Sequence, residues 1–478
     1  MKKLKLFLAP LLALALVLGA LPTAIMAEPL PDDATLEAYI TKIIKAPKGI
    51  DLPDNLVFDF TITPVSVDGD ESQASKMPTI QDAKIIFDAS TAVVSSDLYY
   101  DYLKQEVKVD IDLEPEHGAF GVKSLNDLDL GTGIYLYKVE EVIDTNTLTP
   151  GTTASGVDYE HGLNYSAATY YIYICVAECE GTDGTASGDP CLYHTAGDLY
   201  TYAVLVVTGT DDAGTDIPAE KVKAGEGEYG MAFTNTYWRE YGEVPPTDGQ
   251  GQFYVEKIIN GSKSSFKFAV TVTASDEYML ANPGATPAYW ASIMEESATP
   301  GVWTNITPAT ANDDPTYGYY YIVGSGGTLT VNLSNGQRLA YWNNLDVSAT
   351  YAVTEEGADQ YLPQVFVVHN DTAIGGRNGV TNNGGADFSI PDIYVNAAAG
   401  ASSGVIDTLR VGDVEQGASY ASFVNSYQNT PPTGIALNGM SYIGLIILAV
   451  GGLLLFVALK RRKKNDEAED EAYICSKV

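Results

Sequence analysis

The sequence has little of the chemistry from which metal centres and nucleophilic active sites are built. Its 478 residues include only four Cys and four His, and no histidine stands near a nucleophile in a recognisable pattern. No glycine-rich loop of the phosphate-binding type is evident. Acidic pairs such as Asp211–Asp212 lack the spaced oxygen ligands of a calcium loop, so we expect solvated turns there. The sequence therefore predicts no metal site, no cofactor and no enzymatic activity.

Basic residues are also scarce. Lys and Arg number 27 against 62 Asp and Glu, a formal net charge of -35. A chain this acidic cannot neutralise a phosphate backbone, which excludes nucleic acid as a partner. Hydrophobic residues make up 45% of the chain, so it is not a disordered acidic tail. Abundant Tyr, Thr, Val and Gly favour strands and turns, and the length suffices for two cores. These features predict an all-β protein.

The two ends predict export and membrane insertion. Residues 1–27 combine three lysines, an apolar run and small residues before Ala27, the pattern of a secretory signal peptide. An N-terminal membrane anchor is the alternative, although the apolar run is short for a full span. Residues 435–459 are nearly free of charge and predict a transmembrane helix. Basic residues open the tail 460–478, which we expect to be cytoplasmic.

The segment 429–434 precedes this span. A proline-containing pentapeptide ending in Thr-Gly, then an apolar helix and a basic stop, resembles the cell-wall sorting signal that sortases read. The resemblance implies that a sortase cleaves after the threonine and joins it to an amine of peptidoglycan or of another subunit. The usual first leucine is a threonine here, which implies a variant sortase; a proline-rich stalk on a permanently membrane-bound protein is the alternative. The five residues are Thr430, Pro431, Pro432, Thr433 and Gly434.

Three sequence landmarks occur twice in the same order, which predicts two copies of one unit. Lys42 and Glu141 are 99 positions apart, and Lys257 and Glu355 are 98 apart. The last landmark, Phe-X-Asn-X-Tyr, ends both units. We expect domains at 28–238 and 253–428, joined by a linker at 239–252. The paired landmarks are Tyr39–Ile44 with Tyr254–Ile259, Tyr135–Glu141 with Tyr351–Glu356, and Phe233–Tyr237 with Phe423–Tyr427.

Strand parity places one polar residue of each landmark on the apolar face. Residues two apart share a face of a strand, so each polar residue has large apolar neighbours on its own side. By the same parity Glu140, Glu356 and Lys45 fall on the solvated face. Each unit is thus predicted to bury one lysine, one glutamate and one asparagine. These are Lys42, Glu141 and Asn235 in the first unit, and Lys257, Glu355 and Asn425 in the second.

Such a trio can form a covalent bond by itself. Burial lowers the pKa of a lysine and raises that of a glutamate, and a neutral lysine amine is a nucleophile. A protonated glutamate can donate a hydrogen bond to the asparagine oxygen and then pass its proton to the departing ammonia. The product is a Lys–Asn isopeptide bond. Buried but merely hydrogen-bonded polar residues in a conventional β-sandwich are the alternative.

These landmarks resemble the self-crosslinking domains of Gram-positive pilins and surface adhesins, particularly the FctA-type pilin domain. The strand series from Leu329 to Glu355 is similar to that of CnaB-type domains. The resemblance implies two tandem Ig-like, CnaB-type β-sandwiches. It further implies that Lys42 is joined to Asn235 with the help of Glu141, and Lys257 to Asn425 with the help of Glu355. A long late insertion in the first unit departs from the family pattern.

Other candidate residues lie around that insertion. Cys179 and Cys191 bracket a loop between two strand-like runs, where a disulfide and two separate thiols are equally compatible with an exported protein. Strand parity predicts Cys175 to be a buried thiol. Pilin subunits also need a surface lysine that receives the next subunit, and Lys221 and Lys223 stand in about the right place. Exposed charge decoration is the alternative for both lysines.

Together these features predict a structural protein of the cell surface, exported and attached to the wall by a sortase. A pilin subunit or stalk is the first interpretation, with other pilin subunits as partners. The alternative is a wall-anchored adhesin whose first domain binds a host protein or glycan through the insertion. A wall-bound hydrolase lacks any convincing catalytic constellation in the sequence.

Overall fold

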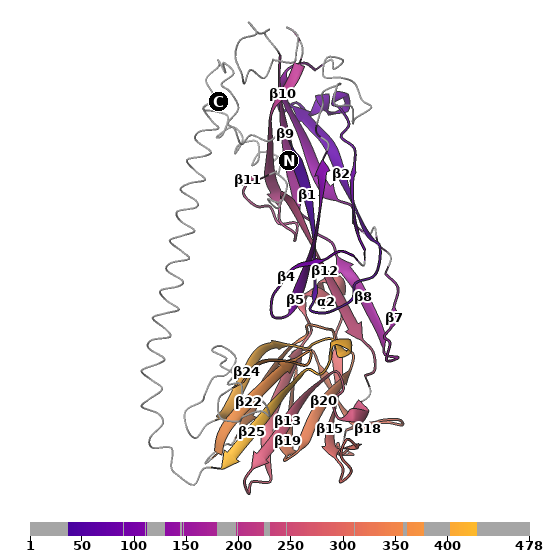
Figure 1. Cartoon of the computed structure of the whole chain (residues 1–478), viewed down its shortest axis with the longest axis vertical. Helices are drawn as coiled ribbons and strands as arrows, with labels where there is room; N and C mark the ends of the chain where they lie inside the picture. Colours follow the sequence, from indigo (N-terminus) through magenta and orange to yellow (C-terminus); the bar gives the residue numbers. More distant parts are fainter. Residues whose placement is uncertain are drawn as a thin grey trace, which may run out of the picture.

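The computed structural model describes residues 37–427 apart from 89, 110, 112–129, 144–145, 147, 179–196, 198, 224–229, 245, 310, 357–360 and 377–401. Figure 1 shows two β regions arranged end to end, the first in indigo to magenta and the second reaching orange and yellow. The prediction of an all-β protein is confirmed, and the only α-helix in these ranges is the six-residue α2 (Asp276–Ala281). The expected signal peptide, sorting motif, membrane span and tail lie outside the described residues, as do Cys179 and Cys191.

The first region consists of two six-stranded sheets that enclose one core. One sheet has the order β4 (Val93–Ser96), β5 (Tyr100–Val109), β1 (Ala38–Pro47), β12 (Met231–Tyr241), β8 (Asp158–Asn164) and β7 (Gly151–Thr152). The other has the order β11 (Lys221–Val222), β10 (Leu199–Thr210), β9 (Thr169–Glu178), β6 (Gly133–Glu141), β2 (Leu56–Val67) and β3 (Ala83–Phe87). A 3-10 turn, η2 (Glu71–Lys76), follows β2.

The second region repeats this plan with a nine-stranded and a four-stranded sheet around a second core. The larger sheet has the order β17 (Asn312–Asp314), β18 (Gly318–Gly324), β15 (Ala288–Glu296), β20 (Gln337–Asn343), β13 (Phe253–Asn260), β25 (Tyr420–Tyr427), β22 (Tyr361–His369) and β23 (Thr372–Gly376), with β16 (Trp303–Asn305) paired to β15. The smaller has the order β19 (Thr328–Ser334), β14 (Ser265–Thr273), β21 (Thr350–Glu356) and β24 (Ser402–Arg410).

In both regions the first and last strands of the unit lie side by side and run parallel. β1 pairs with β12, and β13 pairs with β25. Antiparallel neighbours could be joined by a short turn, whereas parallel neighbours require a long crossover, and here almost the whole unit forms that crossover. A bond between the first and last strands therefore closes a loop as long as the unit itself.

The segment expected to be a linker is structured along much of its length. β12 continues to Tyr241, and Arg239 and Tyr241 are buried. The Val244 N–H donates to the Trp342 carbonyl oxygen at 2.7 Å, and η4 (Pro246–Asp248) follows. The strand extends this far because it pairs with β8 up to Tyr241, which lies opposite Tyr159. The Arg239 guanidinium on this stretch meets Asp413 of the second region, just before η5 (Val414–Gln416). Local sequence could not reveal that partner.

A second contact between the regions involves Lys45, which we expected on a solvated face. Its Nζ lies 2.8 Å from Glu277 Oε1 of α2. The Tyr100 hydroxyl donates to the same carboxylate oxygen at 3.0 Å. The Asn164 amide donates to the Glu277 carbonyl oxygen at 2.7 Å. Lys45 is therefore half-buried because α2 of the second region covers it.

Candidate functional site

The three predicted residues of the first region meet inside its core. Lys42 projects from β1, Asn235 from the neighbouring β12, and Glu141 from β6 of the opposite sheet. Lys42 Nζ lies 2.8 Å from each Glu141 carboxylate oxygen. The Asn235 Nδ2 donates to Glu141 Oε1 at 2.8 Å. One carboxylate thus bridges the amine and the carboxamide across the sandwich.

The second region builds the same arrangement from the equivalent strands. Lys257 lies on β13, Asn425 on β25 and Glu355 on β21 of the facing sheet. Lys257 Nζ is 2.6 Å from Glu355 Oε1, and Asn425 Nδ2 donates to that oxygen at 3.0 Å. Lys257 Nζ also donates to the Phe423 carbonyl oxygen at 3.2 Å. The structure therefore brings both predicted trios together.

Aromatic rings and strand backbone exclude water from both sites. Lys42, Asn235, Lys257, Glu355 and Asn425 are each 0% exposed. An equivalent pair of Phe rings packs beside each trio, Phe60 against Phe233 and Phe268 against Phe423. Further rings lie under the two lysines: Nζ is 4.8 Å from the Phe58 ring centre in the first region and 4.4 Å from the Phe266 ring centre in the second. These surroundings have a low polarity, in which an isolated charge is costly.

The low polarity of these surroundings shifts the pKa values of the buried lysines and of Glu141. Burial lowers the pKa of Lys42 to about 8, because lost solvation outweighs the attraction of Glu141. Burial likewise lowers the pKa of Lys257 to about 8, against the attraction of Glu355. Burial also raises the pKa of Glu141, against the opposing charge of Lys42. Amine and carboxylate in the first region are thus both driven toward their neutral forms, which a nucleophilic amine requires.

The hydrogen bonds correct one detail of the predicted chemistry. We expected the glutamate to donate to the asparagine oxygen, but Glu141 faces Asn235 Nδ2 instead. Asn235 Oδ1 accepts the backbone N–H of Ser166 at 2.7 Å. Glu141 is therefore placed to move a proton from the amine to the departing nitrogen. Ser166 and its partner Asp212 were not predicted, because they approach the site from turns that carry no pattern.

The remaining predicted residues lie away from the trios. Lys221, in the two-residue strand β11, is exposed, and so is Lys223 just after it. Cys175 is half-buried on β9, on the face opposite the buried Ile172 and Ile174. The prediction of a buried thiol was wrong there, because strand parity was assigned from the tyrosines rather than the isoleucines.

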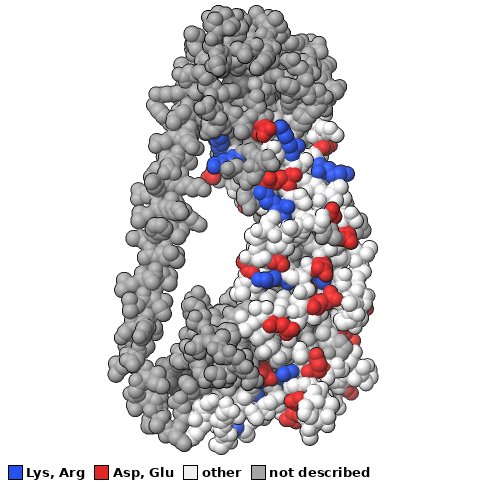
Figure 2. All heavy atoms as spheres, in the orientation of Figure 1, with Lys and Arg blue, Asp and Glu red and all other residues white. Residues whose placement is uncertain are grey.

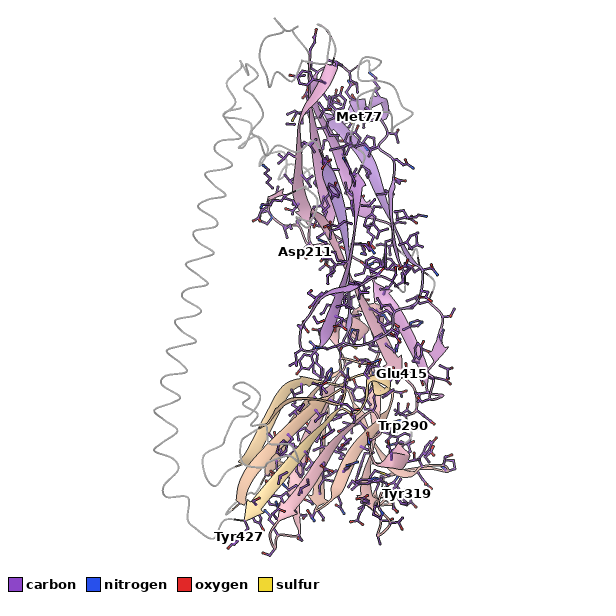
Figure 3. The ribbon with its side chains drawn as sticks, in the orientation of Figure 1. Met77, Asp211, Trp290, Tyr319, Glu415 and Tyr427 are labelled. Carbon is purple, nitrogen blue, oxygen red and sulfur yellow. The ribbon has the colours of Figure 1, made fainter. Side chains whose placement is uncertain are left out.

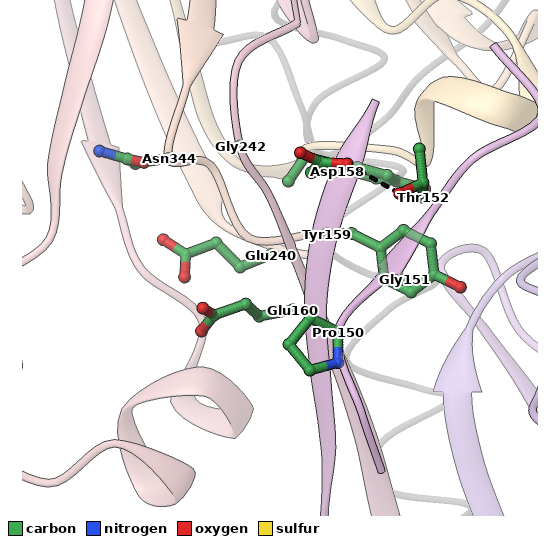
Figure 4. Close-up of a pocket in the computed structure, with 10 residues that line it drawn as sticks. Pro150, Gly151, Thr152, Asp158, Tyr159, Glu160, Glu240, Gly242 and Asn344 are labelled. Carbon is green, nitrogen blue, oxygen red and sulfur yellow. Dashed lines mark hydrogen bonds between the residues drawn. The ribbon is translucent and has the colours of Figure 1, made fainter. Parts of the chain in front are cut away.

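Most of the described surface in view is uncharged, and Asp and Glu are spread over it more widely than Lys and Arg (Figure 2). An open hollow of about 380 Å³ lies near the junction of the regions, and Figure 4 shows Glu160 and Glu240 pointing to the same side of it. Within the described ranges, no three His, Cys, Asp or Glu residues are grouped as a metal site. Nor does any helix there have the length and apolar character to cross a membrane.

No family model matches the chain, and neither does any curated protein. Among solved structures, the chain is similar to the major pilin from Streptococcus pyogenes, at 14% identity over 83% of this chain and 99% of that one, with a TM-score of 0.25. The chain is also similar to the T-13 major pilin of S. pyogenes, at 14% identity over 83% of this chain and 98% of that one, with a TM-score of 0.24. A mutant shaft pilin from Lactobacillus rhamnosus GG is 10% identical over 83% of this chain and 100% of that one, with a TM-score of 0.16.

Proposed function

We propose that this protein is a structural subunit of the cell surface, a pilin or stalk, whose two modules at 28–238 and 253–428 are each locked by an isopeptide bond. Lys42 is joined to Asn235, and Lys257 to Asn425. Glu141 and Glu355 transfer the protons that each reaction needs. The single observation that carries the proposal is the water-free Lys–Glu–Asn trio, built twice with the same strand geometry.

A mechanical role follows from where these bonds would lie. Each would join the first strand of a module to its last strand, which are parallel neighbours. Tension applied at the two ends of a module would then pass through covalent bonds instead of unzipping the sheet. By the chain-entropy model for disulfides, closing so long a loop removes about 5 kcal/mol of unfolded-state entropy. Both effects suit a stalk under load.

Attachment to the wall belongs to the same proposal and rests on the sequence alone. A sortase would cleave between Thr433 and Gly434 and join Thr433 to peptidoglycan or to a lysine of another subunit. Lys221 and Lys223 are exposed near the end of the first module and are candidates for that receiving amine.

Mass spectrometry of the purified full chain tests the covalent part. Each bond releases one ammonia, so the intact mass should fall short of the sequence mass by two molecules of ammonia, after allowance for any signal-peptide cleavage. Peptide mapping should recover two branched peptides, one containing Lys42 and Asn235 and the other Lys257 and Asn425. Full mass and unbranched lysine peptides would leave only a conventional β-sandwich.

A further inference from the structure

The carbonyl side of the Asn235 carboxamide has a dedicated hydrogen-bond donor. The Ser166 backbone N–H lies 2.7 Å from Asn235 Oδ1, and both residues are buried. A backbone N–H can only donate, so the atom that faces it must be the oxygen. Nδ2 consequently faces Glu141, 2.8 Å away. The backbone at residue 166 therefore sets which side of the amide leaves and which side accumulates charge.

A second contact holds Ser166 in this position. Ser166 lies in the turn between β8 and β9, and its hydroxyl donates to Asp212 Oδ1. The same oxygen accepts the N–H of Thr234 at 3.0 Å, directly before Asn235 on β12. The Ala167 N–H donates to the Asp212 carbonyl oxygen at 2.9 Å. Asp212 thus ties the donor loop to the strand that carries the electrophile; its neighbour Asp211 marks this turn after β10 in Figure 3.

We propose that the Ser166 N–H is the oxyanion donor for Lys42–Asn235 bond formation, and that Asp212 is its positioning residue. This inference rests on the proposed function. The Lys42 Nζ lone pair attacks Asn235 Cγ, and the carbonyl π electrons move to Oδ1, where the Ser166 N–H receives the developing charge. Glu141 takes a proton from Nζ and delivers it to Nδ2. The Cγ–Nδ2 bond then breaks, ammonia leaves, and the Nζ–Cγ amide remains.

The second module supplies an internal reference. Asn425 Oδ1 is buried and accepts no hydrogen bond from the described residues. A preorganised donor to the developing oxyanion accelerates acyl transfer by roughly 10²–10³-fold. We therefore expect the Lys42–Asn235 bond to form before the Lys257–Asn425 bond in the same molecule. Comparing the rates of the two bonds in the same molecule then distinguishes a change that acts on the first site from one that impairs folding as a whole.

The test is a time course of both bonds in full chain made by cell-free translation. The peptide amide of Ser166 is replaced by an ester, using the α-hydroxy analogue of serine, which removes the N–H and keeps the side chain. The matched control carries the same replacement at Ala167, whose N–H bonds Asp212 rather than Asn235. Samples are quenched at intervals, and peptide mapping measures the fraction of each lysine that is branched.

We expect the ester at 166 to slow the Lys42–Asn235 bond about 100-fold and to leave the Lys257–Asn425 bond unchanged. The ester at 167 should slow formation of the Lys42–Asn235 bond by less than about tenfold.

Asp212→Ala should also slow formation of the Lys42–Asn235 bond. Asp212→Asn should restore most of the rate, because an amide oxygen still accepts both hydrogen bonds. Equal rates for the two esters would overturn the inference. Two slowed bonds would show misfolding and also refute it. Absence of both bonds from the unmodified chain would refute the proposed function, and the inference with it.

Discussion

Lys42 lies opposite Phe233 in the parallel pair of β1 and β12, so Asn235 follows two residues later on the same face. Lys257 lies opposite Phe423, two residues before Asn425, in the pair of β13 and β25. The lysine is long enough to span this offset, which brings its Nζ beside the carboxamide. Both modules share the register, and register is strongly specified where one face is buried. A slip by one residue would turn Asn235 away from the core.

The glutamates are expected to act on one bond each. Glu141→Ala should abolish the Lys42–Asn235 bond and leave the Lys257–Asn425 bond intact, because proton transfer in the first site depends on Glu141 alone. Glu355→Ala should have the opposite effect. The intact mass of either variant should then fall short of that variant's own sequence mass by one ammonia instead of two. Glu140→Ala, on the partly exposed face of the same strand, is the control and should retain both bonds.

Loss of a bond should lower stability by a calculable amount. Asn235→Ala cannot form the first bond, and the chain-entropy model predicts a loss of about 5 kcal/mol from that module. The change also leaves the buried Ser166 N–H without its acceptor, which adds to the loss. Calorimetry should show one transition moving to lower temperature and the other staying in place. Asn312→Ala, on the exposed strand β17, should shift neither.

One of the contacts between the two modules is a buried ion pair. Arg239 Nη1 lies 3.3 Å from Asp413 Oδ2, with the two side chains 4% and 1% exposed, and the Tyr241 hydroxyl donates to Asp413 Oδ1 at 2.8 Å. Asp413→Ala leaves the buried guanidinium with only the more exposed Glu415 carboxylate, 3.7 Å away, at a cost of up to about 3–5 kcal/mol. Small-angle scattering should then show a wider spread of end-to-end distances.

The control for this change is the surface pair of Lys267 and Glu356, whose side chains are 50% and 45% exposed. Glu356→Ala should cost less than about 1 kcal/mol and leave the scattering profile as it was. If Asp413→Ala also left the profile unchanged, the ion pair would not be what orients the modules.

Stability should depend on pH through Glu240 at the same junction. Burial raises the pKa of Glu240 to about 7, helped by the nearby charges of Asp346 and Glu160. The folded protein then holds a proton that the unfolded chain, with a pKa near 4.5, has released. Stability therefore falls as the pH rises from about 5 to 8. Glu240→Gln should flatten this slope of the unfolding temperature; an unchanged slope would assign the effect to other groups.

Attachment by a sortase should depend on Thr433 in the C-terminal segment. Co-expressed with its sortase, the protein should give high-molecular-weight ladders that resist boiling in detergent, and Thr433→Ala should abolish them. Of Lys221→Ala and Lys223→Ala, the variant that lacks the receiving amine should lose the ladder and keep the monomer, and the other should keep both. A single wall-linked band of monomer size would favour the adhesin interpretation.

Much of the site could be predicted because strands alternate with a period of two. That parity identified Lys42, Glu141 and Asn235, and the same argument applied to the second copy identified Lys257, Glu355 and Asn425. It assigned Glu140 to the outer face correctly. It failed for Cys175, because β9 carries tyrosines on one face and isoleucines on the other, and both kinds of residue are common in a core.

Composition and local periodicity were enough to predict the β class, the repetition of one unit and the inward side chains of the strands that carry the two trios. Three contacts could be known only from the fold: Glu141 approaches from the opposite sheet, Ser166 and Asp212 lie against Asn235 and its strand, and Arg239 pairs with Asp413. These contacts join residues far apart in the chain, and their geometry depends on how whole sheets pack.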